Sequence, residues 1–234
     1  MLFRVIDTTE SQLATSSPAV EPLTLDEVKL QRRFSTTSLD SLFTTYIAAA
    51  RQLFEEATGV QLIMATWAYW LDAFPCALGL TNALQIELPH PPLQAVLSVK
   101  YDDATGAEQT LDPATYRVIQ PGGMYPQRAR IVPVINVQWP IAACQPKAVR
   151  IEFTAGFGDT ADSVPPLAKY ALMMLVGHFH KFAEEIQDEN RARITQLPIG
   201  AATVIDAYKK SAVQTLVPRH HGYFGYGDYG RVWG

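Results

Sequence analysis

The sequence predicts an α+β protein: a helical core with an inserted antiparallel β region (a small sandwich or open barrel) and an extended C-terminal tail. Two sequence patterns predict this arrangement of helices and strands. Apolar residues recur at helical spacing on both sides of residues 62–158, and within that stretch they alternate between Pro- and Gly-rich turns. We therefore divide the chain into a flexible N-terminal arm (1–20), a central domain (21–212) and a tail rich in glycine and aromatic residues (213–234).

Composition limits the classes of protein that the chain can represent. Hydrophobic residues make up 48% of its 234 residues, which is enough for a buried core, and the formal net charge is −4. A free-standing nucleic-acid-binding protein normally carries a basic surplus or a dense Lys/Arg stripe. The longest apolar run, residues 170–179, is too short to cross a membrane. We expect neither tight DNA binding nor a membrane association.

Four helices are expected, over residues 24–33, 38–58, 165–186 and 201–212. Thr24 and Glu27 match a capping box at the start of the first helix. Ser38 is the expected N-cap of the second, and Gly59 is placed to end it in the left-handed conformation. Pro165-Pro166 opens the third helix, which is apolar nearly all round. Such a helix is typically buried on two sides, by its own core and by a neighbour.

Seven short strands are expected between the second and third helices, over residues 63–72, 84–88, 96–102, 108–111, 116–120, 130–134 and 148–154. Asp103-Ala104-Thr105-Gly106 predicts a hairpin turn with a positive φ at Gly106. A second glycine pattern, Gly156-Phe157-Gly158, lacks the third glycine and the lysine of nucleotide-binding loops. We interpret it as a strand-to-helix turn that needs a positive φ.

The sequence contains no complete catalytic or metal-binding motif. His178 and His180 are two residues apart on a helix and point to different faces, whereas His180 and Glu184 share a face as a surface polar contact. Cys76 and Cys144 fit neither a zinc nor a redox motif. We therefore expect no catalytic residue, no metal and no cofactor, and we do not expect an enzyme.

Two groups of residues are candidate binding sites for other proteins. Aromatic residues at the density seen in the tail are typical of interfaces rather than of solubility tails, although a disordered end remains the alternative. The predicted partner-binding residues of the tail are Tyr223, Phe224, Tyr226, Tyr229 and Trp233, with Arg219 and Arg231 adding charge. The predicted subunit interface on the third helix consists of Tyr170, Met173, Met174 and Phe179.

Several short motifs occur in a fixed order along residues 20–210. They are EPLTLDEVK (21–29), YIAAAR with EEATG (46–59), IMATW (63–67), LPHPPL (88–93), YDD with LDPATY (101–116), FTAGFGD (153–159) and VPPL (164–167). Each motif alone is weak, but the ordered set resembles the head–tail connector (adaptor) proteins of tailed bacteriophages. The N-terminal arm and the C-terminal tail lie outside this resemblance.

The resemblance implies a structural virion protein located in the neck and assembled in the host cytoplasm. Such a protein would form a ring of roughly twelve copies with a closed heterologous interface between subunits. The ring would lie between the portal protein and the stopper or tail-completion proteins, and DNA would pass through its channel without tight binding. We further expect the helices to form the ring body and the β region to project outward, with loops 102–106 and 121–127 facing partners.

Two other classes of function remain open. One is a glycan- or receptor-binding β module attached to a phage particle, for which Trp67, Tyr69 and Trp139 would have to form an exposed aromatic platform. The other is a hydrolase or lyase built on the β region, for which carboxylates or histidines would have to converge in a cleft.

Overall fold

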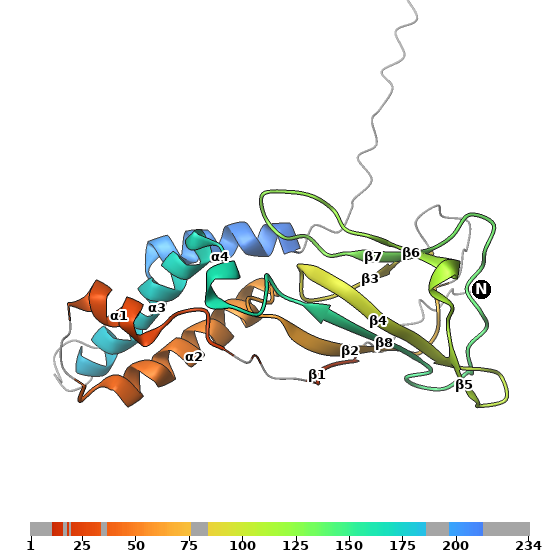
Figure 1. The fold of residues 1–234 in the computed structure, drawn as a ribbon, viewed down its shortest axis with the longest axis horizontal. Coiled ribbons are helices and arrows are strands. Elements are labelled where there is room, and N and C mark those ends of the chain that lie inside the picture. Colours follow the sequence, from red (N-terminus) through yellow and green to blue (C-terminus); the bar gives the residue numbers. More distant parts are fainter. Residues whose placement is uncertain are drawn as a thin grey trace, which may run out of the picture.

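The computed structural model describes residues 11–15, 18, 20–33, 37–75, 84–185 and 197–212. The helices gather at one end of an elongated molecule and the strands at the other, so the predicted α+β class is confirmed (Figure 1). The helices are α1 (Leu25–Arg32), α2 (Asp40–Thr58), α3 (Pro166–Glu185) and α4 (Ile199–Ala212). The strands are β1 (Ser11–Ala14), β2 (Ala65–Leu71), β3 (Ile86–Glu87), β4 (Leu93–Asp102), β5 (Glu108–Thr110), β6 (Tyr116–Ile119), β7 (Arg130–Pro133) and β8 (Val149–Ala155).

The strands form two antiparallel sheets, of order β1-β2-β8-β4-β5 and β3-β7-β6. Both sheets contribute to one buried cluster, with Ile151 and Phe153 from β8 facing Ile86 and Ile131 from the smaller sheet. Along β8, buried and half-buried residues alternate strictly, as expected for a strand with one face in the core. The β region is therefore a two-layer sandwich, one of the two predicted forms.

The helices form a second core of their own. Phe43, Ile47 and Phe54 on α2 pack with Leu172 and Leu175 on α3, and α4 closes the group. α1 begins with the predicted capping box: Thr24 accepts from the backbone N–H of Glu27, whose carboxylate accepts from the backbone N–H of Thr24. α2 ends at Gly59, whose φ of 71° confirms the predicted left-handed cap.

The structure corrects three predictions from sequence. The N-terminal arm contains a strand, β1, which extends the larger sheet along the edge of β2. Pairing of this strand depends on its backbone hydrogen bonds and not on an alternation of apolar side chains, so the sequence did not predict it. The N-cap of α2 is Leu39, without a side-chain cap, rather than Ser38. His180 is buried and its ring lies 5.2 Å from that of Phe43, because α3 packs against α2 on this face, so it is not a surface polar contact.

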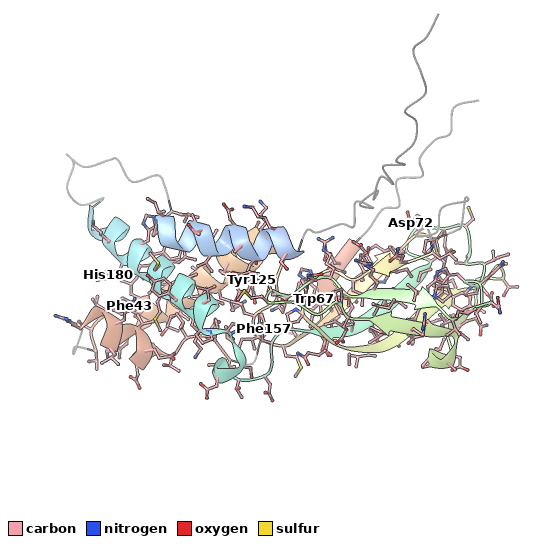
Figure 2. The ribbon with its side chains drawn as sticks, turned by 90° about the horizontal axis from the view of Figure 1, so that it is seen from above. Phe43, Trp67, Asp72, Tyr125, Phe157 and His180 are labelled. Atoms are coloured by element: carbon pink, nitrogen blue, oxygen red, sulfur yellow. The ribbon has the colours of Figure 1, made fainter. Side chains whose placement is uncertain are left out.

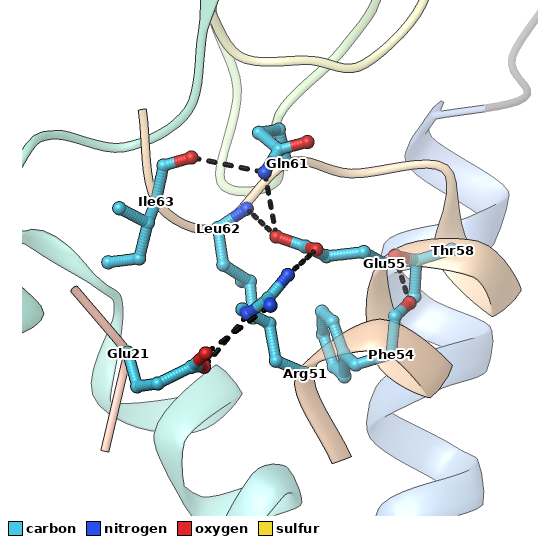
Figure 3. Close-up of polar contacts among 8 residues, drawn as sticks. All are labelled: Glu21, Arg51, Phe54, Glu55, Thr58, Gln61, Leu62 and Ile63. Atoms are coloured by element: carbon cyan, nitrogen blue, oxygen red, sulfur yellow. Dashed lines mark hydrogen bonds and ion pairs between the residues drawn. The ribbon is translucent and has the colours of Figure 1, made fainter. Parts of the chain in front are cut away.

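Three junctions hold the helical end and the sandwich together. At the first, Figure 3 shows Arg51 donating to Glu21 and to Glu55, both at 2.8 Å. Glu55 also accepts from the backbone N–H of Leu62 at 3.0 Å and from the side-chain amide of Gln61 at 2.9 Å. The network therefore ties the segment before α1 and the end of α2 to the chain that enters β2.

The second junction is the turn after β8. Gly156 has a φ of 132°, and a Cβ at this position would lie 2.6 Å from the backbone N and Cα atoms of Met64. The predicted turn with positive φ is thus confirmed, and it is filled by backbone rather than open to a phosphate group. The following Phe157 donates its backbone N–H to Leu62 at 3.1 Å and packs against the helical core.

The third junction is loop 121–127, which runs back from the smaller sheet to α4. The rings of Tyr125 and Tyr208 meet edge to face at 5.1 Å. The hydroxyl of Ser211 lies 3.3 Å and 3.2 Å from the carbonyl oxygens of Tyr125 and Pro126, to which it donates. Figure 2 labels Tyr125 between the helices and the strands. This loop, predicted to face partners, is anchored within the subunit, although Met124 at its tip is 92% exposed.

Candidate interaction surfaces

The predicted binding residues of the tail lie outside the described residues. Arg219, Tyr223, Phe224, Tyr226, Tyr229, Arg231 and Trp233 all follow α4, which is described to Ala212. Their role stays a prediction from composition. α4 itself fixes where the tail leaves the domain, because Tyr208 and Ala212 are buried against the helical core.

The four residues of the predicted subunit interface are placed differently on α3. Tyr170 is 52% exposed, whereas Met173, Met174 and Phe179 are half-buried and pack against the helical core. Phe179 contacts the ring of Tyr46 on α2, at 6.1 Å between centroids. Of the four, Tyr170 thus offers the most free surface, and Phe179 mainly joins α3 to α2.

Two exposed apolar residues that were not predicted from the sequence, Leu167 and Ile199, lie beside the predicted interface residues of α3. Leu167 lies one turn before Tyr170 on the same face of α3. Ile199, 87% exposed, opens α4 next to Gly200, where a Cβ would lie 2.9 Å from the sulfur of Met174. We call Leu167, Tyr170, Met174 and Ile199 the α3–α4 surface. The sequence offers one indication of this exposure, because Ile199 directly follows Pro198 and so lies in the first turn of a helix.

The aromatic residues named for a glycan platform do not form one. Tyr69 is buried in the sandwich core. Trp67 stacks on His90 at 3.7 Å between centroids. Trp139 stacks on Phe74 and donates its ring N–H to the carbonyl oxygen of Leu84 at 2.8 Å. These side chains are committed to intramolecular contacts on different elements, so this feature gives the glycan-binding alternative no support.

Titratable groups of the β region have structural partners. Burial, together with the positive charge of Arg128, lowers the pKa of His90 to about 4, so its imidazole is neutral at physiological pH. Hydrogen bonds from the Thr105 hydroxyl, the Gln109 amide and two backbone N–H groups hold the pKa of Asp103 well below its usual range. Asp103 thereby closes the predicted hairpin turn, in which Gly106 has a φ of 83°.

Within the described ranges, no group of three or more His, Cys, Asp or Glu side chains is arranged to hold a metal ion. The same part of the chain contains no helix that is long and apolar enough to span a membrane. The convergent carboxylates or histidines that the hydrolase or lyase alternative requires are likewise not gathered around the described cavities.

The protein is similar in fold to several solved structures, whereas comparisons of its sequence give no match. No protein-family model matches the chain, and no curated protein matches its sequence. A chain in the neck of an empty gene transfer agent (GTA) particle, computed with C6 symmetry, superposes with a TM-score of 0.67 at 21% identity; the match covers 89% of this chain and 99% of the other.

Two further solved structures give the same result. A chain of the virion of a native gene transfer agent particle matches with a TM-score of 0.64, 21% identity and coverage of 88% and 97%. A chain in the neck of a native particle, computed with C12 symmetry, matches with a TM-score of 0.61, 21% identity and coverage of 89% and 99%. The protein therefore has the fold of chains found in these particles, over almost the whole length of those chains.

Proposed function

We propose that this protein is a structural head–tail connector of a tailed bacteriophage or phage-like particle, and that it has no enzymatic role. The observation that carries the proposal is the fold likeness to chains of particle necks, which covers 99% of their length. The ordered motifs along residues 20–210 point independently to the same class of protein. Assembly would take place in the host cytoplasm, and the mature location would be the virion neck.

In this role the subunit forms a ring of about twelve copies between the portal protein and a stopper or tail-completion protein. The neck structures that share its fold were computed with C6 and C12 symmetry, which supports a ring of this order. Three junctions between the helices and the sandwich make the subunit a stiff building block. DNA passes through the channel without tight binding, as the net charge of −4 suggests.

The α3–α4 surface is our candidate for one side of the interface between ring neighbours. It combines Tyr170 with the exposed apolar residues Leu167 and Ile199, and exposed apolar groups of this kind are typical of protein interfaces. A charge placed there should block ring formation and leave the fold intact. Tyr170→Asp and Ile199→Asp test this, and Ile135→Asp is the matched control, because Ile135 is also largely exposed but lies in the β region.

The C-terminal tail is our candidate for portal attachment. Five aromatic residues within twelve positions offer anchors for pockets on a partner, each worth roughly 1–3 kcal/mol when well buried. Deleting residues 223–234 should leave thermal unfolding of the subunit unchanged and weaken its binding to the portal.

Of the two loops predicted to face partners, the hairpin 102–106 is the better candidate, because it lies at the far end of the sandwich from the helices whereas loop 121–127 is anchored on α4.

The proposal is tested by mixing the purified protein with the portal protein of the same virus and measuring the mass of the complex. We expect one ring of this protein on each portal ring, for the parent chain and for Ile135→Asp, and weakened assembly for Tyr170→Asp and Ile199→Asp. A two-fold dimer, or no association with the portal under any condition, would contradict the proposal. Unchanged portal binding after deletion of residues 223–234 would remove the tail from it.

A further inference from the structure

A cavity of about 300 Å³ opens between the two sheets, at the edge where β1 and β3 are the outermost strands. We call it the edge cavity. Part of its lining is apolar and consists of three buried side chains, those of Tyr69, Leu71 and Ile86. Another part is polar and comes from segments far apart in the sequence, with the side chains of Gln12, Gln85, Glu87 and Arg128. The edge cavity therefore places polar groups directly beside an apolar wall.

Arg128 is the uncompensated charge of this cavity. The acidic residue of the lining, Glu87, lies 3.6 Å from Arg130 and is balanced by it. Arg128 makes no hydrogen bond or ion pair with any described residue, and its Nε atom is buried without an acceptor. Burial and the positive charge of Arg128 together keep the neighbouring His90 neutral by lowering its pKa. A buried guanidinium nitrogen without an acceptor is costly, so this position favours an anionic partner.

The two glutamines of the lining add hydrogen-bond donors. The carbonyl oxygen of the Gln12 side chain lies 2.7 Å from Nε2 of His90. This oxygen can only accept, so the neutral imidazole carries its proton on Nε2 and donates it. The carbonyl oxygen of the Gln85 side chain accepts from a terminal guanidinium nitrogen of Arg130 at 3.5 Å. The amide NH₂ groups of Gln12 and Gln85 make no hydrogen bond with any described residue, so both remain as donors.

These side chains determine which ligand chemistry fits the cavity. A guanidinium and two amide groups offer donors and one positive charge, which disfavours amines and metal cations. A carboxylate has two acceptor oxygens and one negative charge, so it matches these donors in both number and sign. The apolar wall beside them suits a short hydrocarbon chain, which leaves water when it packs there.

We propose that the edge cavity binds an aliphatic carboxylate. Its oxygens accept hydrogen bonds from Arg128, Gln12 and Gln85, and its carbon chain packs on the apolar part of the lining. The carboxylate belongs either to a free short-chain acid or to a glutamate side chain of another protein. The site is built within one subunit, so it goes beyond the connector role and does not depend on it.

The site is tested by titrating butyrate into the full chain at neutral pH and following its amide signals by two-dimensional NMR. Butyramide, which has the same shape without the charge, is the control ligand. We expect butyrate to shift the signals of residues 12, 85–87 and 128 and the side-chain amides of Gln12 and Gln85. It should bind about tenfold more tightly than butyramide, because it alone compensates Arg128. Equal affinities, or shifts that map outside the cavity, would overturn the proposal.

Variants of the cationic group provide a second test. Arg128→Gln should lower the affinity for butyrate about tenfold, and Arg128→Lys, which keeps the charge, should lower it less. Arg117→Gln is the matched control, because Arg117 is an exposed arginine of β6 that does not line the cavity. Thermal unfolding of each variant separates a loss of binding from a loss of the fold. Equal effects of Arg128→Gln and Arg117→Gln would contradict the site.

The source of the carboxylate is determined with a capped tripeptide that carries one glutamate between two alanines. Tighter binding of this peptide than of butyrate, lost when glutamine replaces the glutamate, would assign the carboxylate to a protein partner. Binding of butyrate at least as tight as that of the peptide would assign it to a free acid. Binding of neither ligand would overturn the proposal, and this result would leave the ring assembly test of the connector role unaffected.

Discussion

The backbone N–H of Leu62 donates to the carboxylate of Glu55 across 3.0 Å, and this bond joins the last turn of α2 to the start of the β region. A glutamate this close to a helix C-terminus is unfavourable for the helix dipole. Tertiary contacts offset this unfavourable position, because Arg51 and Gln61 also donate hydrogen bonds to the carboxylate of Glu55. Burial nevertheless raises the pKa of Glu55, against the opposing effect of the Leu62 N–H and of Arg51. This partly buried carboxylate thus forms the centre of one of the three junctions between the helices and the sandwich.

Glu55→Ala should lower the free energy of unfolding by about 2–3 kcal/mol, because it leaves the Leu62 N–H without an acceptor and Arg51 with Glu21 alone. The matched control is Glu56→Ala, an exposed neighbour that should change stability by less than about 0.5 kcal/mol. Urea denaturation of both variants measures the difference. Equal losses would show that Glu55 does not hold this junction.

Gly156→Ala should destabilise the protein by about 3 kcal/mol or more, because the new Cβ would meet the backbone of Met64 and the φ of 132° is strained for alanine. Gly122→Ala is the control, since a Cβ there meets nothing within 4 Å and its backbone has no such φ. Thermal unfolding of the two variants compares them. A mild effect at position 156 would mean that the turn after β8 can move away from Met64.

Tyr125→Ala should cost about 2–4 kcal/mol, because the ring that packs on Tyr208 is lost and the loop is released from α4. Hydrogen exchange of residues 208–212 should rise with it. The adjacent Met124→Ala should be nearly neutral, because that side chain is almost fully exposed. If both variants behave alike, the loop does not join the smaller sheet to α4.

The stability contributed by His90 should depend on pH. Its pKa is about 4 in the folded chain and near 6.5 when unfolded, so between these values the unfolded state binds more protons and stability falls as the pH is lowered. His90→Asn removes the titration and tolerates the left-handed backbone at this position, where φ is 59°. The stability advantage of the parent chain over this variant should therefore shrink by about 2–3 kcal/mol between neutral pH and pH 4. A pH-independent difference would contradict the burial of a neutral imidazole.

Local signals in the sequence predicted the elements well. The capping box at Thr24, the end of α2 at Gly59 and the turn at Gly106 each depend on a few neighbouring residues, and all three are present. Six of the seven predicted strands overlap the observed ones within two residues at each end, and β4 starts three residues earlier than predicted. The sequence did not distinguish sandwich from barrel, because that depends on pairings between strands far apart in the chain.

The features that were missed depend on tertiary contacts. β1 is an edge strand held by backbone hydrogen bonds, so no periodicity marks it. Glu55 and loop 121–127 gain their roles from Leu62 and Tyr208, which no local pattern connects to them. Of the four predicted interface residues on α3, Tyr170 is the exposed one, since Met173, Met174 and Phe179 pack against the helical core of the subunit.

The most direct test of the connector role is electron cryomicroscopy of the neck of the particle that encodes this protein. We predict a closed ring of about twelve copies directly on the portal, each with the four-helix and two-sheet fold described above and with the α3–α4 surface at the contact between neighbours. A neck without this chain, or a chain placed as an isolated two-fold dimer, would contradict the account.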